Sequence, residues 1–144
     1  GIESGSERVL FQNDKYYPRG KIFETVKSTL EEEINVSASF VLGLIGETRE
    51  SLAETEKVAN VLGRWPGVRV YANCVIPLPG SRLWEVFTAH PSVKDKHADI
   101  FSYDLAEARK DYIQRCTDVT LEDIFAARDR ILARIGLESR EYAR

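Results

Sequence analysis

Residues 35–48 read NVSASFVLGLIGET, a β-branched and apolar run that ends in a loop with two glycines. The run over residues 35–42 predicts a β-strand, and Thr48 is placed to act as the N-cap of a following helix. That helix is expected over residues 49–64, because apolar residues recur there at helical spacing. Its inner face consists of Leu52, Val58, Ala59 and Leu62. A strand–loop–helix unit therefore stands at the centre of the fold.

The same alternation continues on both sides of this unit. Residues 19–33 carry an apolar helical stripe, residues 65–67 form a Trp-Pro-Gly turn, and residues 68–75 predict a second strand. Residues 76–81 follow as a loop whose prolines cannot pair in a sheet. Helices that alternate with short strands indicate βα units, a parallel sheet and right-handed crossovers. The sequence thus predicts an α/β fold.

The pattern changes after residue 81. A short helical segment is expected over residues 82–89, followed by a polar linker that reaches to about Asp99. Two helices then follow without a strand between them, over residues 104–116 and from Thr120 to a stop at Gly136. Residues 89–144 are therefore predicted to be a helical extension, separate from an α/β part that covers residues 1–88.

Composition excludes several classes of protein. The chain has 144 residues, 43% of them hydrophobic and 30% charged, and a net charge of −3. No block of Lys or Arg is present, which argues against a dedicated nucleic-acid surface or an anionic-membrane binder. No apolar stretch is long enough to span a bilayer, and no signal peptide is visible. The chain contains no Met and opens on Gly1, so we expect a fragment of a longer protein.

The residues that commonly bind metals are few. Cys74 and Cys116 stand 42 positions apart. Two cysteines cannot by themselves hold an iron–sulfur cluster, which needs three or four thiolates. We interpret them as free, mostly buried thiols in a cytoplasmic protein, although a disulfide is possible. His90 and His97 have no ligand partner at a suitable spacing and are predicted to lie on the surface. No metal site is expected.

Three segments, in this order, resemble one family. They are GIESGSERVL at residues 1–10, VLGLIGET at residues 41–48, and the run over residues 71–81 that closes with PLPGS. They are similar to the fourth-strand end, the fifth-strand glycine loop and the sixth-strand loop of radical S-adenosylmethionine (SAM) enzymes. The middle segment resembles the G-x-P-G-E-T loop of the methylthiotransferase and cobalamin-binding branches, with Ile45 in place of proline. The spacing of about 40 residues fits one βα unit between segments.

The resemblance implies the carboxy-terminal half of a six-stranded (β/α)6 partial TIM barrel. It further implies a parent enzyme in which a 4Fe–4S cluster on a C-x-x-x-C-x-x-C loop cleaves SAM reductively. The 5′-deoxyadenosyl radical that results abstracts hydrogen from a substrate, which the sequence does not identify. Cobalamin is a further possible cofactor of such a parent. The cluster motif is absent from this chain, so the fragment is expected to be inactive alone and to contain no catalytic residue.

The resemblance also implies which residues contact SAM. They are Glu3, Ser4, Lys15, Val41, Gly43, Ile76 and Pro77. Glu3 and Ser4 match positions that contact the ribose or the methionine moiety, and Lys15 matches one that pairs with the methionine carboxylate. Val41 and the Ile76 backbone match the adenine contacts. Independently of SAM, Gly43 is expected to be a turn glycine with positive φ. Glu47 is expected to favour the helix N-terminus electrostatically rather than to act in catalysis.

Other interpretations remain open. The chain could be a non-catalytic α/β module that binds a partner through its sheet. A flavodoxin-like or Rossmann nucleotide binder is disfavoured, because the loop at Gly43 does not match G-x-G-x-x-G. We expect a homodimer, since an open strand edge and a concave face lined by Phe40, Leu42 and Val75 would invite pairing. The competing possibility is that the extension folds back over that face through the apolar residues Leu121, Phe125 and Leu132.

Overall fold

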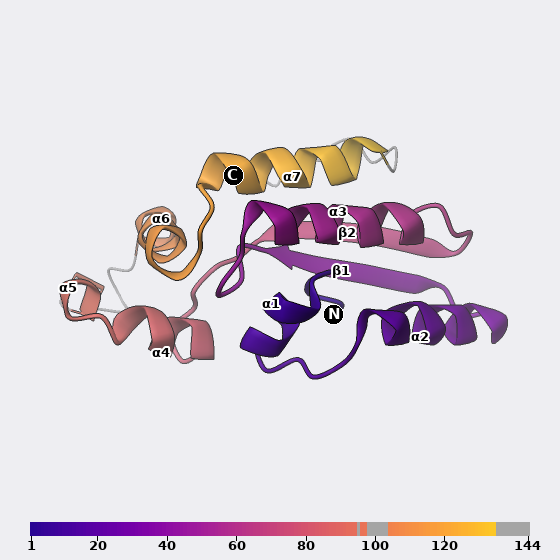
Figure 1. Cartoon of the computed structure of the whole chain (residues 1–144), viewed down its shortest axis with the longest axis horizontal. Helices are drawn as coiled ribbons and strands as arrows, with labels where there is room; N and C mark the ends of the chain where they lie inside the picture. Colours follow the sequence, from indigo (N-terminus) through magenta and orange to yellow (C-terminus); the bar gives the residue numbers. More distant parts are fainter. Residues whose placement is uncertain (95, 98–103, 135–144) are drawn as a thin grey trace.

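Two parallel strands, β1 (Val36–Leu42) and β2 (Val68–Cys74), form the sheet at the centre of the computed structural model (Figure 1). They pair residue for residue, from Val36 opposite Val68 to Leu42 opposite Cys74. The structure describes residues 1–94, 96–97 and 104–134. Both strands lie within one residue of the predicted bounds, so the prediction of an α/β fold with parallel strands is confirmed.

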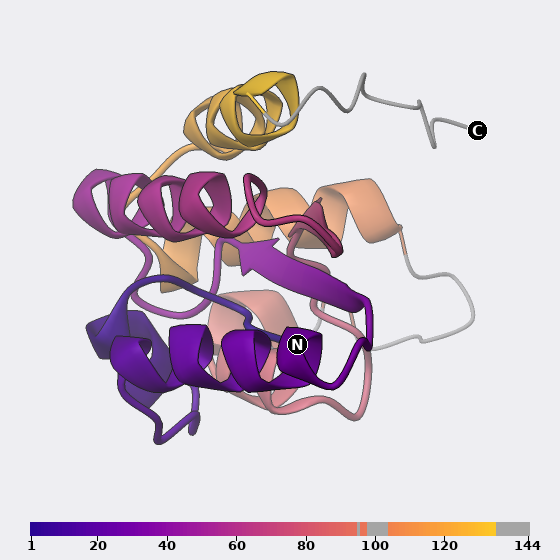
Figure 2. The ribbon, with the colours of Figure 1, turned by 90° about the vertical axis from the view of Figure 1, so that its right-hand side faces the viewer.

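The described residues contain seven helices. They are α1 (Glu7–Gln12), α2 (Arg19–Glu31), α3 (Arg49–Leu62), α4 (Arg82–Thr88), α5 (Pro91–Lys94), α6 (Leu105–Cys116) and α7 (Leu121–Arg134). Helices α2 and α3 lie on the same side of the sheet, and α7 packs beside α3 and against β2 (Figures 1 and 2). Helices α4, α5 and α6 lie beyond the ends toward which the strands run (Figure 1).

Alternate residues of the strands face the helices. In β1 these are Ala38, Phe40 and Leu42, each at most 1% exposed, and in β2 they are Val70 and Ala72. The expectation that Phe40, Leu42 and Val75 line an open concave face is therefore wrong, since all three are buried in the core. The alternation itself is as predicted, but the apolar set belongs to the face that the helices cover.

The opposite face of the sheet is polar and accessible. Three cross-strand pairs form it: Ser37 with Arg69, Ser39 with Tyr71, and Val41 with Asn73. Arg69, Tyr71 and Asn73 are exposed, and Tyr71 retains 42% of its accessible surface. We call these six residues the open face.

The start of the chain adds a third parallel segment beside β1. The amides of Ile2 and Glu3 donate to the Ser39 carbonyl at 2.8 and 3.0 Å, and the Val41 amide donates to the Glu3 carbonyl at 2.8 Å. Glu3 thereby forms a parallel bridge with Phe40. The spatial order is residues 2–3, then β1, then β2. Two paired strands and one bridge establish a parallel arrangement without defining a barrel.

Local signals explain most helix boundaries. Thr48 caps α3 as predicted: its hydroxyl accepts from the Ser51 amide at 3.2 Å, and the Ser51 hydroxyl accepts from the Thr48 amide at 2.8 Å. Thr120 and Asp123 make the equivalent reciprocal contacts at the start of α7.

Helix α1 was not predicted, and α5 lies within the segment expected to be a polar linker. The predicted stop at Gly136 falls outside the described residues.

The extension packs against the α/β part. Helix α7 buries Ile124, Ala127 and Ile131 completely against α3 and β2. Leu121, Phe125 and Leu132, the residues expected to cover an open face, are only half-buried. The helix therefore covers the side of β2 that already faces α3, and the open face stays accessible.

We expect Gly5→Ala to destabilise the chain, because a Cβ at this position would lie 2.7 Å from the Glu54 carbonyl oxygen and 2.7 Å from the Thr55 Cα. Both are backbone atoms of α3 that cannot move aside. The expected loss is about 1–3 kcal/mol in the free energy of unfolding, measured with urea. Gly20→Ala is the control, since a Cβ there meets nothing within 4 Å and improves helix propensity. Equal urea midpoints for the two variants would contradict this account.

Candidate functional site

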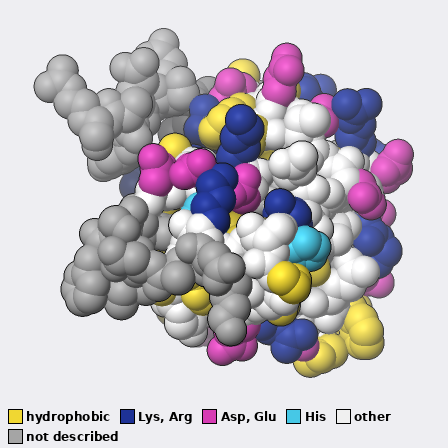
Figure 3. All heavy atoms as spheres, turned by 90° about the vertical axis from the view of Figure 1, so that its left-hand side faces the viewer, with side chains coloured by type: hydrophobic (Ala, Val, Ile, Leu, Met, Phe, Trp, Pro, Cys, Tyr) yellow, Lys and Arg dark blue, Asp and Glu magenta, His cyan; other side chains and the backbone are white. Residues whose placement is uncertain are grey.

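The carboxyl ends of parallel strands are where α/β proteins usually place ligands, and most of the predicted SAM-contacting residues gather at this end. Figure 3 views the molecule from that end and shows Lys and Arg side chains interspersed with Asp and Glu. Acidic, basic and apolar side chains share the surface, so the described part of this face has no patch of a single charge. A ligand at this face would have to be recognised by individual side chains rather than by a general electrostatic field.

Glu3 and Lys15 form the charged part of the site. The Lys15 Nζ lies 3.7 Å from Glu3 Oε1, and the two side chains are 46% and 23% exposed respectively. Glu3 has a φ of +64°, a left-handed conformation that costs a non-glycine residue free energy. Backbone strain of this kind is concentrated at functional sites. The structure therefore brings together two of the predicted residues and adds a conformational signal that the sequence did not contain.

Tyr17 holds the segment that carries Glu3, and Asn13 holds the glycine loop beside it. The Tyr17 hydroxyl donates to the Ile2 carbonyl at 2.9 Å. Burial raises the pKa of Tyr17, and the nearby Glu3 carboxylate raises it further. Asn13 donates to the Ile45 carbonyl at 3.0 Å and accepts from the Ile45 amide at 3.2 Å. No sequence pattern predicts these supports, because an isolated Tyr or Asn in a turn carries no motif. Tyr16 lies beside them on the surface and donates to Asp14.

Ser4 is placed differently from Glu3. Its side chain is fully buried, and its hydroxyl lies 3.1 Å from the Thr55 hydroxyl of α3. It also accepts from the Ser6 amide at 3.1 Å. The described contacts of Ser4 are therefore with the α3 side of the sheet, away from the Glu3–Lys15 pair.

The apolar candidates flank the strand ends. Val41 is half-buried and lies on the open face opposite Asn73. Ile76 is half-buried, and Pro77 is buried in the loop that follows β2. Gly43 has a φ of +94°, as expected for a turn glycine. A Cβ on Gly43 would lie 2.8 Å from Ile113 and from Ile124, so this loop packs directly against the helical extension.

Glu47 joins the glycine loop to α3. Its side chain is completely buried, accepts a short hydrogen bond from the Ser51 hydroxyl, and accepts from the Gly43 amide at 3.1 Å. Burial raises the pKa of Glu47, and these hydrogen bonds act in the opposite direction. The predicted structural role is consistent with these contacts, but the complete burial was not foreseen.

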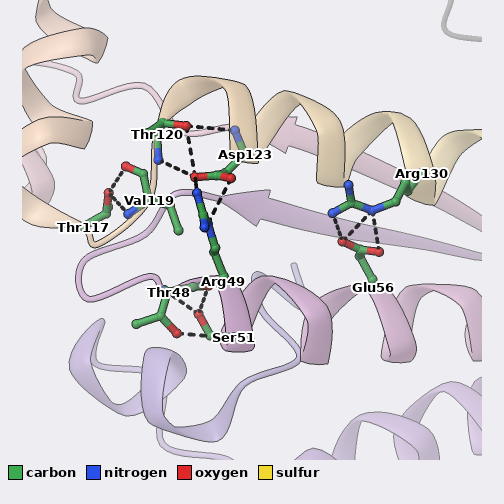
Figure 4. Close-up of polar contacts among 9 residues, drawn as sticks. All are labelled: Thr48, Arg49, Ser51, Glu56, Thr117, Val119, Thr120, Asp123 and Arg130. Atoms are coloured by element: carbon green, nitrogen blue, oxygen red, sulfur yellow. Dashed lines mark hydrogen bonds and ion pairs between the residues drawn. The ribbon is translucent and has the colours of Figure 1, made fainter.

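The extension is fastened to the same region. The Glu47 carbonyl accepts from the Asp118 amide, and the Gly46 amide donates to the Cys116 carbonyl, both at 2.8 Å. Two arginine–carboxylate pairs then join α3 to α7 (Figure 4). Arg49 pairs with Asp123 at 3.1 Å, and Arg130 pairs with the largely buried Glu56 at 2.6 Å. The strand ends and the extension thus form one connected structure.

The predictions made for the histidines and cysteines agree with the structure to different extents. His90 is exposed, as predicted. His97 is only 4% exposed, so its prediction as a surface residue is wrong: it packs on Phe87 and lies 3.0 Å from an Asp111 oxygen. Cys74 and Cys116 are free and partly buried. Among the described residues, no group of three His, Cys, Asp or Glu side chains could hold a metal ion, and no helix is long and apolar enough to cross a membrane.

Comparison with known proteins points to enzymes that transfer methyl or methylthio groups. No protein-family model matches the chain. It is 32% identical over 72 residues to threonylcarbamoyladenosine tRNA methylthiotransferase MtaB of Treponema pallidum, which covers 49% of this chain and 15% of that protein. It is 35% identical over 92 residues to an uncharacterized methyltransferase of Pyrococcus horikoshii, covering 62% of this chain and 19% of the relative. The chain thus spans less than a fifth of either relative.

We expect Glu47 to make stability depend on pH. Because its folded-state pKa is raised, the folded protein binds the proton more tightly than the unfolded chain does. The contribution is complete below the unfolded-state pKa and is lost as pH rises through the folded-state pKa. As pH rises above about 4.5, wild type should therefore lose stability progressively relative to Glu47→Gln, as measured by urea unfolding. A difference between the two proteins that is independent of pH would refute this.

Proposed function

We propose that this chain is part of a radical SAM iron–sulfur enzyme and supplies part of its SAM pocket. The observation that carries the proposal is the Glu3–Lys15 pair, held by strained backbone beside β1 at the carboxyl end of a parallel sheet. The order of the three parallel segments also fits strands four, five and six of a (β/α)6 partial barrel. The methylthiotransferase named above supports this branch of the family, to which the glycine loop also bears a resemblance.

The residues of the chain fit SAM better than they fit the cluster. A cluster needs three or four thiolates, and the chain has only Cys74 and Cys116. The proposal therefore requires the 4Fe–4S ligands, and cobalamin if the parent uses it, to be held by other parts of a longer protein. When bound, such a cluster supplies the electron for the reductive cleavage of SAM. This chain alone is proposed to be inactive.

Each remaining residue has a binding role that its position allows. The Glu3 carboxylate is an acceptor for ribose hydroxyls or for the methionine amino group, and Lys15 is a donor for the methionine carboxylate. Val41 offers an apolar wall, and the loop at Ile76 and Pro77 offers backbone groups to an adenine ring. Gly43 shapes the loop between them. Ser4, which bonds to Thr55, would contribute by fixing the Glu3 segment against α3.

SAM should bind the isolated chain weakly, with a dissociation constant above about 1 mM, because only part of the pocket is present. Titration followed by amide NMR should shift the signals of Glu3, Val41 and Ile76. Glu3→Ala should remove these shifts, whereas Glu32→Ala, at an exposed helix end, should preserve them. In the longer enzyme, Glu3→Ala should impair SAM cleavage far more than Glu32→Ala does. Equal behaviour of the two variants, or shifts located elsewhere, would favour a non-catalytic interaction module.

We further propose that the chain forms a homodimer through its open face and the unpaired strand edges. The extension covers the helix side of β2, which leaves Arg69, Tyr71 and Asn73 accessible. Strand edges with unpaired amides and carbonyls tend to pair with another copy. Sedimentation at micromolar concentration should give twice the chain mass of 16.3 kDa. A monomer over the whole concentration range would contradict the proposal, and Tyr71→Glu should weaken the dimer if it forms.

A further inference from the structure

Helix α6 carries two buried hydrogen-bond donors that have no acceptor. The Arg109 Nε and the Tyr112 hydroxyl are both inaccessible to solvent, and neither has a hydrogen-bond partner in the part of the chain that the structure describes. Arg109 also makes no ion pair there, although arginines elsewhere on α3 and α7 do. A buried donor without an acceptor costs about 1–3 kcal/mol. Two such groups on one helix therefore need an explanation.

The two donors belong to one place in the fold. Residues three positions apart on a helix lie on the same face, so Arg109 and Tyr112 are neighbours. Tyr112 is 0% exposed, whereas Arg109 is half-buried and reachable from solvent. Ile113, the residue after Tyr112, and Ile124 of α7 both lie close to Gly43. The donors thus lie close to the junction of α6, α7 and the end of β2.

Both cationic and acidic groups lie near this pair. Cys74, the last residue of β2, lies near both groups: burial raises the pKa of its thiol, and the charges of Arg109 and Arg128 oppose that shift. Burial also raises the pKa of Tyr112, with smaller contributions from Cys116, Glu47 and Cys74, so its hydroxyl stays protonated and remains a donor. Arg128, on α7, is paired with Asp129 and lies over the Phe125 ring. The Glu47 carboxyl accepts from Ser51 and Gly43 rather than from Tyr112.

We propose that Arg109 and Tyr112 bind an oxyanion, the carboxylate or phosphate group of a ligand, at the junction of α6, α7 and β2. Such a group has several acceptor oxygens, so one can accept from the Arg109 Nε–H and another from the Tyr112 hydroxyl. A guanidinium donates to oxyanions through hydrogen bonds that are stronger than neutral ones. The site lies on the helix side of β2, opposite the open face, and does not depend on the function proposed above.

Two salts distinguish the two kinds of oxyanion. Inorganic phosphate and sodium acetate are titrated separately into the full chain, with ionic strength held constant by sodium chloride. We expect saturable shifts of the Cys74 and Tyr112 backbone amides, with half-saturation near about 1 mM for the preferred anion. A response to acetate alone assigns a carboxylate, and a response to phosphate alone assigns a phosphate group. If neither anion gives a saturable shift beyond that of chloride, water satisfies the donors and the proposal is wrong.

Three variants test the residues themselves. Arg109→Gln should abolish saturation, and Tyr112→Phe should weaken binding about 5- to 10-fold, the loss expected for one hydrogen bond. Arg115→Gln, at an exposed position of the same helix, should bind as wild type does. Urea unfolding without the anion checks that each variant folds. With the anion present, the urea midpoint of wild type and of Arg115→Gln should rise, and that of Tyr112→Phe should rise less. Binding that is unchanged in Tyr112→Phe and Arg109→Gln would overturn the assignment.

Discussion

The buried carboxylate of Glu47 joins three parts of the chain at the carboxyl ends of the strands. Its oxygens accept from the Gly43 amide and the Ser51 hydroxyl, which links the loop after β1 to the first turn of α3. The backbone carbonyl of the same residue accepts from Asp118, and this links both to the extension. Removing a carboxylate from water is costly, and hydrogen bonds to it offset that cost. The position of the glycine loop, and hence of the strand ends, depends on this residue.

Local signals in the sequence predicted the central unit well. The run at residues 35–42 predicted β1, and the N-cap at Thr48 predicted the start of α3. Both signals depend only on residues that are close in sequence. Helix α1 was missed because six residues are too few to show a helical period. The side to which Phe40 points could not be decided from alternation, since a period of two does not say which face the helices cover. His97 was misplaced for a related reason, as its burial results from contacts with α4 and α6.

The candidate site was predictable in part. Glu3 and Lys15 stand twelve positions apart, and only the family resemblance suggested a common role; α1 lies between them and turns the chain back. No sequence pattern could show that Glu3 adopts a positive φ, because glycine and asparagine are the usual residues in that conformation. Ser4 illustrates the opposite case, since the residue adjacent to Glu3 faces α3 and bonds to Thr55. Neighbouring positions at a strand end can therefore serve the site and the core separately.

The pairing of α7 with α3 has a consequence for how the chain folds. Arg49 contacts Asp123 and Arg130 contacts Glu56, each across a separation of 74 residues. Contacts this distant in sequence close a long loop and slow the folding of a small protein. During synthesis, the helix face of β2 remains without its cover until α7 has been made. Over that interval the nascent chain exposes apolar surface from β2 and α3, which makes the docking of α7 the step at which chaperones or misassembly would compete with folding.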